Sequence, residues 1–154
     1  MASETGLWRF SLKDGTRALV VPLEADRPET RSNDGRADPW GGFWIGTMGK
    51  SAEADAGAIY RFYKGELRSL YQPITISNAI CFSPDRQYAY YTDTITKLVM
   101  RQPLNPVDGW PKGAPEVYLD LVNEGLNPDG AVIDLDGNMW LCLLYTSPSP
   151  RDRG

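Results

Sequence analysis

The sequence contains no histidine and only two cysteines among its 154 residues. Without histidine, this chain alone cannot build a Ser-His-Asp or Cys-His catalytic apparatus, and it offers few nitrogen ligands for zinc or copper. Cys81 and Cys142 have a spacing unlike that of a metal-binding pair and do not form a disulfide framework, so a reducing compartment is the simpler expectation. What remains is chemistry based on carboxylates, amides and metal ions.

Long apolar runs and an excess of positive charge are also missing. No run approaches the roughly 18 residues that a membrane helix needs, and residues 1–20 lack the layout of a signal peptide. We therefore expect a cytoplasmic protein without a membrane partner. Sixteen basic residues against 20 acidic ones give a net charge of −4, which argues against nucleic acid as a partner. Apolar residue types make up 42% of the chain, which is typical of a folded globular protein.

The apolar residues follow a strand period rather than a helical one. Short alternating runs rich in aromatic and β-branched residues recur between Gly, Pro, Asp and Asn, and this pattern predicts an all-β fold. Three hairpins are expected, which pair residues 8–12 with 18–21, 58–63 with 67–71, and 88–92 with 97–101.

Three related segments repeat along the chain. They begin at Asn33, Asn78 and Asp129, and each continues through a turn into an aromatic strand. The starting residues are 45 and 51 positions apart, and a Pro- and Gly-rich loop over residues 103–115 accounts for the longer interval. A period of about 40–50 residues that carries several short strands is typical of β-propeller blades.

Equivalent positions in successive blades point toward one shared axis. Asn33, Asn78 and Asp129 are therefore expected to converge there. Two amides and a carboxylate supply only oxygen ligands, which suit Ca²⁺, Mg²⁺ or Mn²⁺ and are poor for a soft metal. The alternative is that these residues only cap turns at the starts of strands, where Asn and Asp are common.

Three ordered motifs give the chain a family resemblance that extends from Ala2 to Leu141. They are Arg31 to Pro39 running into Phe43 to Met48, then Ile76-Ser77-Asn78 with Ser83-Pro84-Asp85, and Pro128-Asp129-Gly130 with Asp136 to Trp140. The sequence resembles the senescence marker protein-30, gluconolactonase and luciferin-regenerating enzyme family, which includes regucalcin. The resemblance implies a six-bladed β-propeller with a divalent metal at its axis, commonly a lactonase acting on sugar lactones.

The resemblance also implies roles for individual residues. Asn78 and Asp129 match two metal ligands, which would hold one divalent cation, Ca²⁺ first, with Mg²⁺, Mn²⁺ or Zn²⁺ as alternatives. Arg31 and Asn33 match the pair that holds the substrate hydroxyls and the lactone group, so Asn33 moves from ligand to substrate contact. Asp129 is also the candidate catalytic base. The plainer interpretations are a solvated surface charge for Arg31 and a turn for Asn33.

Some parts of the family pattern are not matched. The first blade of the family contributes a glutamate ligand, and Glu4 is not a match for it. We expect residues 1–141 to form a partial six-bladed propeller with about three to four blades present. The stretch from Cys142 to Asp152 looks like a translated sequencing adapter, so residues 142–154 are interpreted as a non-native or disordered tail. A flexible Ser-Pro tail is the alternative.

These features predict a fragment of a metal-dependent sugar lactonase, which opens a lactone ring to the aldonic acid. The full-length parent is expected to be an active monomer with a small-molecule sugar lactone as its partner, and the fragment itself to be inactive. Two alternatives remain open, which are a non-catalytic calcium-binding propeller of the regucalcin type and a related esterase or phosphotriesterase. The sequence defines neither the lactone nor the native metal.

Overall fold

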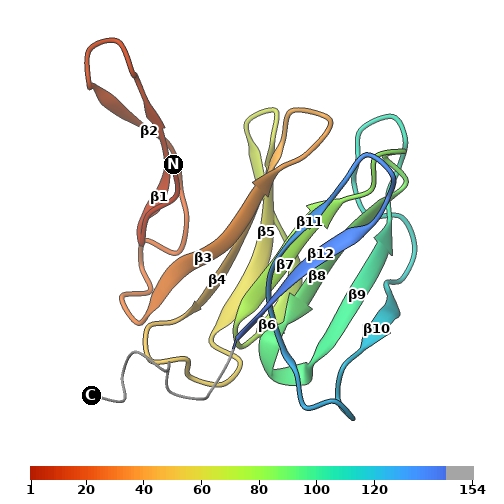
Figure 1. Ribbon diagram of the computed structural model, residues 1–154. Coiled ribbons are helices and arrows are strands. Elements are labelled where there is room, and N and C mark those ends of the chain that lie inside the picture. Colours follow the sequence, from red (N-terminus) through yellow and green to blue (C-terminus); the bar gives the residue numbers. More distant parts are fainter. Residues whose placement is uncertain (145–154) are drawn as a thin grey trace, which may run out of the picture.

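The computed structural model describes residues 1–144, which form antiparallel strands and one short 3₁₀ helix, η1 (Thr94–Thr96). Figure 1 shows the sheets side by side, with the β1–β2 hairpin at one end. Within these residues, no helix is long and apolar enough to cross a membrane. The strands are β1 (Gly6–Phe10), β2 (Arg17–Pro22), β3 (Thr30–Ala37), β4 (Phe43–Gly49), β5 (Gly57–Tyr63), β6 (Glu66–Ile74), β7 (Ser77–Phe82), β8 (Tyr88–Asp93), β9 (Leu98–Pro103), β10 (Glu116–Asp120), β11 (Asn127–Ile133) and β12 (Met139–Leu144).

The strands form two four-stranded blades and two strand pairs. One blade has the order β3-β4-β5-β6 and the other β7-β8-β9-β10, while β1 pairs with β2 and β11 pairs with β12. Every pair is antiparallel and joins strands that are consecutive in the chain. Each four-stranded sheet is an antiparallel meander, which is the structure of a propeller blade. The fold therefore confirms the all-β class and the blades predicted from the repeats.

The three predicted hairpins are present as β1–β2, β5–β6 and β8–β9. In the β5–β6 turn, Lys64 and Gly65 have φ values of 49° and 82°, which suit a tight two-residue connection. The β8–β9 connection instead contains η1, whose N-cap is Asp93. The Asp93 carboxylate also accepts hydrogen bonds from Thr75 N (2.8 Å) and Ile76 N (3.0 Å), so its role is structural.

The main core lies between the two complete blades. Trp44 and Ile59 from one blade pack in a cluster with Ile80 and Tyr91 from the other. Trp44 is fully buried, and its ring meets Phe82 edge to face at 5.4 Å between centroids. Aromatic side chains at this interface thus fill the space between blades.

The two cysteines have different surroundings. Cys81 is buried in a second cluster between β7–β9 and β11, and burial raises the pKa of its thiol to about 12. It packs as a small apolar side chain. Cys142 is exposed and lies in β12.

Strand β12 extends past the boundary predicted at residue 141. It runs to Leu144, and its last two residues are paired in register with Asn127 and Pro128 of β11. The apolar run Leu141-Cys142-Leu143-Leu144 continues the strand through the first three residues of the predicted tail. The rest of the predicted tail, residues 145–154, lies outside the described residues, and its interpretation stays a prediction.

A buried ion pair stabilises the first complete blade. Arg61 Nε donates to Asp38 Oδ2 at 2.7 Å, and both side chains are fully buried. The Arg61 guanidinium also lies over the rings of Tyr63 and Trp110, at 4.3 and 4.4 Å from their centroids. The other oxygen of Asp38 accepts two backbone N–H groups of the β3–β4 turn. The carboxylate therefore holds the turn and balances a buried charge at once.

We expect Asp38→Ala to lower the free energy of unfolding by about 3–5 kcal/mol, because it leaves the Arg61 charge buried without its partner. Urea unfolding followed by tryptophan fluorescence measures the loss. The matched control is Glu66→Ala, which removes the exposed pair with Arg68 and should cost less than about 1 kcal/mol. Equal losses in the two variants would contradict the structural role of the buried pair.

Candidate metal and substrate site

Strands β3, β7 and β11, each the first strand of its sheet, carry a β-bulge. In each strand two residues lie opposite a single residue of the next strand, which bends the strand and re-aims its side chains. The two residues are Asn33 and Asp34 in β3, Ala79 and Ile80 in β7, and Asp129 and Gly130 in β11. Asn33 and Asp129 thus begin their bulges, whereas Asn78 directly precedes its own.

One arginine joins these three strands. Arg36 of β3 donates from Nε to Ile80 O of β7 at 3.1 Å, and from Nη2 to Ala131 O of β11 at 2.8 Å. The acceptors are backbone carbonyl groups, one within the β7 bulge and the other next to the β11 bulge. The side chain therefore fixes the spacing of the three strands at the level of the site.

The structure brings the four predicted site residues together in one row. Arg31 Nη1 donates to Asn33 Oδ1 at 3.2 Å. Asn33 Nδ2 donates to Ser77 O at 3.0 Å and lies 3.5 Å from Asn78 Oδ1. The amide of Asn78 in turn lies 3.0 Å from Asp129 Oδ1. Residues from three strands, far apart in the sequence, therefore form one continuous polar group.

The two ends of the Asn78 amide meet different surroundings. One end lies 2.9 Å from Thr94 Oγ1. The other lies 3.0 Å from Asp129 Oδ1 and 3.3 Å from the carbonyl oxygen of Ser77, both of which are acceptors. When Nδ2 faces Thr94, Asn78 Oδ1 therefore meets two oxygens with no proton between them. Oxygens about 3 Å apart suit one hard cation, because Ca²⁺ binds such ligands at roughly 2.3–2.6 Å, so the donor set fits the predicted metal.

The fit rests on amide and carboxylate oxygens together. Within residues 1–144, no group of three or more His, Cys, Asp and Glu side chains is arranged to hold a metal. Asp129 stands beside the Asn78 amide and the Ser77 carbonyl group instead. A search for clustered carboxylates would therefore miss this arrangement, which the repeat pattern indicates.

Asp34 and Thr94 also lie at the site, and the sequence analysis did not select them. Asp34 is half-buried, and Ile80 N donates to its Oδ2 at 2.8 Å. Burial raises the pKa of Asp34, and the Asp129 charge raises it further, against the lowering effect of this hydrogen bond. The sequence Asn33-Asp34-Gly35 has the composition of a turn, and Thr94 follows a residue that also suits one, so neither had a distinctive signal.

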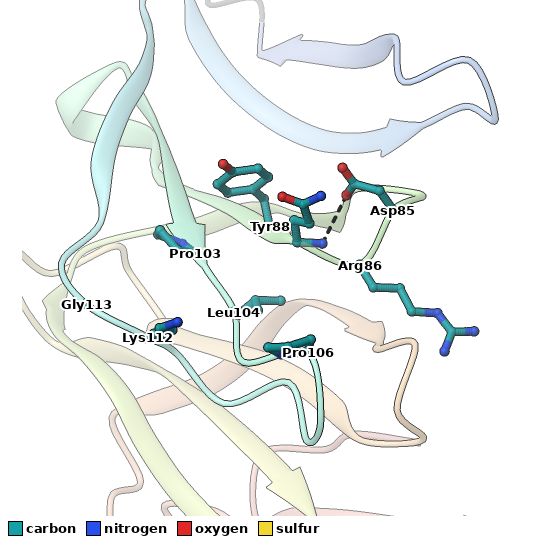
Figure 2. A pocket seen from close by; sticks show the side chains of 9 residues that line it. Asp85, Arg86, Tyr88, Pro103, Leu104, Pro106, Lys112 and Gly113 are labelled. Carbon is teal, nitrogen blue, oxygen red and sulfur yellow. Dashed lines mark hydrogen bonds between the residues drawn. The ribbon is translucent and has the colours of Figure 1, made fainter.

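A separate cavity of about 670 Å³ lies near the other end of β7. It is lined by the β7–β8 turn and by the segment that follows β9, and Figure 2 shows Arg86 extending away from Tyr88 and Pro103. None of Arg31, Asn33, Asn78 and Asp129 lines it. The size of this cavity therefore gives no support to a functional role, and the row of site residues remains the candidate.

A family model for the SMP-30/Gluconolactonase/LRE-like region matches residues 1–148. The chain belongs to this family. The match confirms the resemblance that the three motifs predict.

Known members differ in the activity that their names state. A Rhizobium meliloti protein provisionally named a sugar lactone lactonase is 44% identical over 140 residues, which are 91% of this chain and 47% of that protein. The 6-deoxy-6-sulfogluconolactonase of Pseudomonas putida is 36% identical over 128 residues, which cover 82% and 43%. The structure of the calcium-binding protein regucalcin from Agrobacterium tumefaciens matches with a TM-score of 0.88 and 44% identity, over 91% of this chain and 48% of that one. This chain spans about half the length of the curated relatives it matches.

The raised pKa of Asp34 predicts a pH-dependent stability. The folded state holds the Asp34 proton more tightly than the unfolded state does, so stability falls as pH rises from the ordinary pKa of 3.8 through the raised value. The Asp34→Asn variant lacks this pH-dependent contribution to stability, while its amide oxygen can still accept the hydrogen bond from Ile80 N. We therefore expect the free energy of unfolding of the variant, relative to wild type, to increase with pH across that window, as measured by urea unfolding at a series of pH values.

Asp85→Asn is the matched control with the opposite sign. Hydrogen bonds from Ser83 Oγ and Gln87 N lower the pKa of the exposed Asp85. Its stabilising contribution is present above the ordinary pKa and is lost as pH falls through the lowered one, so the variant should lose its deficit on acidification. The same pH trend in both variants would show that burial does not govern Asp34.

Proposed function

We propose that this chain carries part of the active site of a sugar lactonase that uses one divalent cation, Ca²⁺ first. The observation that carries the proposal is the pair of oxygen-bearing groups on Asn78 and Asp129, which lie 3.0 Å apart although they belong to different sheets. The lactonase names of the relatives support the reaction. The name of the regucalcin structure as a calcium-binding protein supports the cation.

In this proposal, Asn78 and Asp129 hold the cation, and Arg31 and Asn33 hold the substrate. A divalent cation at this position would polarise a lactone carbonyl group and lower the pKa of a nearby water. Arg31 uses one nitrogen, Nη1, for its hydrogen bonds to Ser32 O and Asn33 Oδ1. The contact of Asn33 Nδ2 with Asn78 at 3.5 Å is too long for a strong hydrogen bond. Both side chains therefore retain N–H groups that can donate to the lactone carbonyl oxygen and stabilise its developing charge.

The Asp129 carboxylate is the proposed base. It accepts a proton from water as the water oxygen bonds to the carbonyl carbon of the lactone. The bond between that carbon and the ring oxygen then breaks, and the ring oxygen takes up the proton. The products are the carboxyl group and the hydroxyl group of one aldonic acid, so all atoms of water and lactone are accounted for.

A second candidate function is calcium binding without catalysis. The structural neighbour named as a calcium-binding protein favours this alternative. A lactone hydrolysis assay distinguishes the two functions, because a non-catalytic propeller binds Ca²⁺ and opens no lactone. An esterase or phosphotriesterase activity is separated by assaying lactones beside aryl esters and organophosphates.

In the whole protein that carries this sequence, we expect Asp129→Ala to lower kcat/KM for a sugar lactone by at least about 100-fold, because both a ligand and the base are lost. A pH-stat assay of acid release measures this rate. Asp136→Ala, in the exposed β11–β12 turn, should retain wild-type turnover. Unchanged lactone hydrolysis in Asp129→Ala would refute the proposed site. The cytoplasmic location, the monomeric state and the inactivity of the 154-residue chain stay predictions.

A further inference from the structure

Thr94 contacts one proposed ligand, Asn78, and the residue that precedes the other, Asp129. It begins η1, is only 3% exposed, and has its Oγ1 2.9 Å from the Asn78 amide. The same hydroxyl group donates to the carbonyl oxygen of Pro128 at 2.7 Å. Pro128 directly precedes Asp129, so one buried hydroxyl joins the β7 ligand to the backbone at the β11 ligand.

The orientation of the Asn78 amide follows from counting protons. A threonine hydroxyl has one proton to donate. A carbonyl oxygen can only accept, so at 2.7 Å Pro128 O takes that proton. Thr94 Oγ1 then presents a lone pair to Asn78, which favours Nδ2 on this side. In the reverse orientation, Asn78 Oδ1 and Pro128 O compete for the single Thr94 proton, while Nδ2 gains Asp129 Oδ1 and Ser77 O as acceptors.

We infer that Thr94 is a positioning residue that keeps the Asn78 oxygen directed toward Asp129. This inference rests on the proposed function, in which Asn78 and Asp129 bind the cation. The opposite orientation has partners of its own, because Nδ2 would then donate to Asp129 Oδ1 at 3.0 Å and to Ser77 O at 3.3 Å. That arrangement puts an N–H group where the cation binds and occupies the carboxylate. The Thr94 hydroxyl therefore decides between an amide that accepts the cation and one that excludes it.

Ca²⁺ binding to the 154-residue chain tests this role, with calcium chloride as the probe and side-chain amide NMR shifts as the readout. Removal of the hydroxyl in the isosteric variant Thr94→Val should weaken Ca²⁺ binding about 10- to 100-fold, the usual effect of losing a group that orients a ligand. Thr94→Ser keeps the hydroxyl and should restore binding to near the wild-type value. The matched control is Thr96→Val in the same turn, because the exposed Thr96 hydroxyl donates to Asp93 O at 2.8 Å, and its loss should leave binding unchanged.

Two further variants test the cation site separately from the role of Thr94. Asn78→Ala and Asp129→Ala should each abolish Ca²⁺ binding, and binding that survives both would overturn the proposed cation site. If both abolish binding while Thr94→Val keeps the wild-type affinity, the cation site stands and the role of Thr94 is wrong.

A measurement on the wild-type chain covers the case in which Thr94→Val fails to fold. Nuclear Overhauser contacts from the Asn78 side-chain N–H protons to the Thr94 methyl group are expected once Ca²⁺ is bound. Contacts from these protons to the Asp129 β-protons in place of the Thr94 methyl group would overturn the inference, because they place Nδ2 on the side of the cation.

Discussion

The candidate site depends on one close contact between sheets, in which the Asn78 amide and an Asp129 oxygen lie 3.0 Å apart. Several features hold these two groups in place. The bulges in β3, β7 and β11 re-aim the side chains, and Arg36 fixes the spacing of the three strands through backbone carbonyl groups. The geometry is therefore a property of how blades are placed against each other, and no single blade contains it.

The core and the site follow from the same arrangement of blades. Apolar side chains such as Trp44 and Ile80 fill the space between the two complete blades, which fixes their relative position through close packing. The site residues lie on the first strand of each sheet. Strand β7, the first strand of its blade, packs against β3 and β4 of the preceding blade. Gly46 shows how close this approach is, because a Cβ atom there would overlap Ser77 Oγ. Since Ser77 precedes Asn78, packing between blades and placement of the amide are coupled.

The sequence predicts the parts of this structure that repeat. Asn33, Asn78 and Asp129 were found because they stand at one spacing from their turns, and the strand periods located all three hairpins. Contacts between blades leave no such pattern, so Arg36 and Thr94 could not be selected without coordinates. Strand β12 continues to Leu144 because the run up to that residue carries strand-forming residues. The position of the β7 bulge could not be predicted either. Asn33 and Asn78 stand at the same distance from the turn that follows them, but Asn33 lies within its bulge whereas Asn78 precedes its own.

The carboxylates at the site have no ion-pair partner among the described residues. Within residues 1–144, neither Asp34 nor Asp129 forms an ion pair within 4 Å. Their charges repel, since Asp129 contributes to the raised pKa of Asp34. The Arg36 guanidinium donates to carbonyl oxygens of these strands, and its charge lowers the pKa of Asp34 against this repulsion. Partly buried carboxylates need compensation, which Asn78 Nδ2 gives Asp129 when the amide is turned toward it. In the proposed function, a hard cation would take over this compensation and would also reduce the repulsion between Asp34 and Asp129.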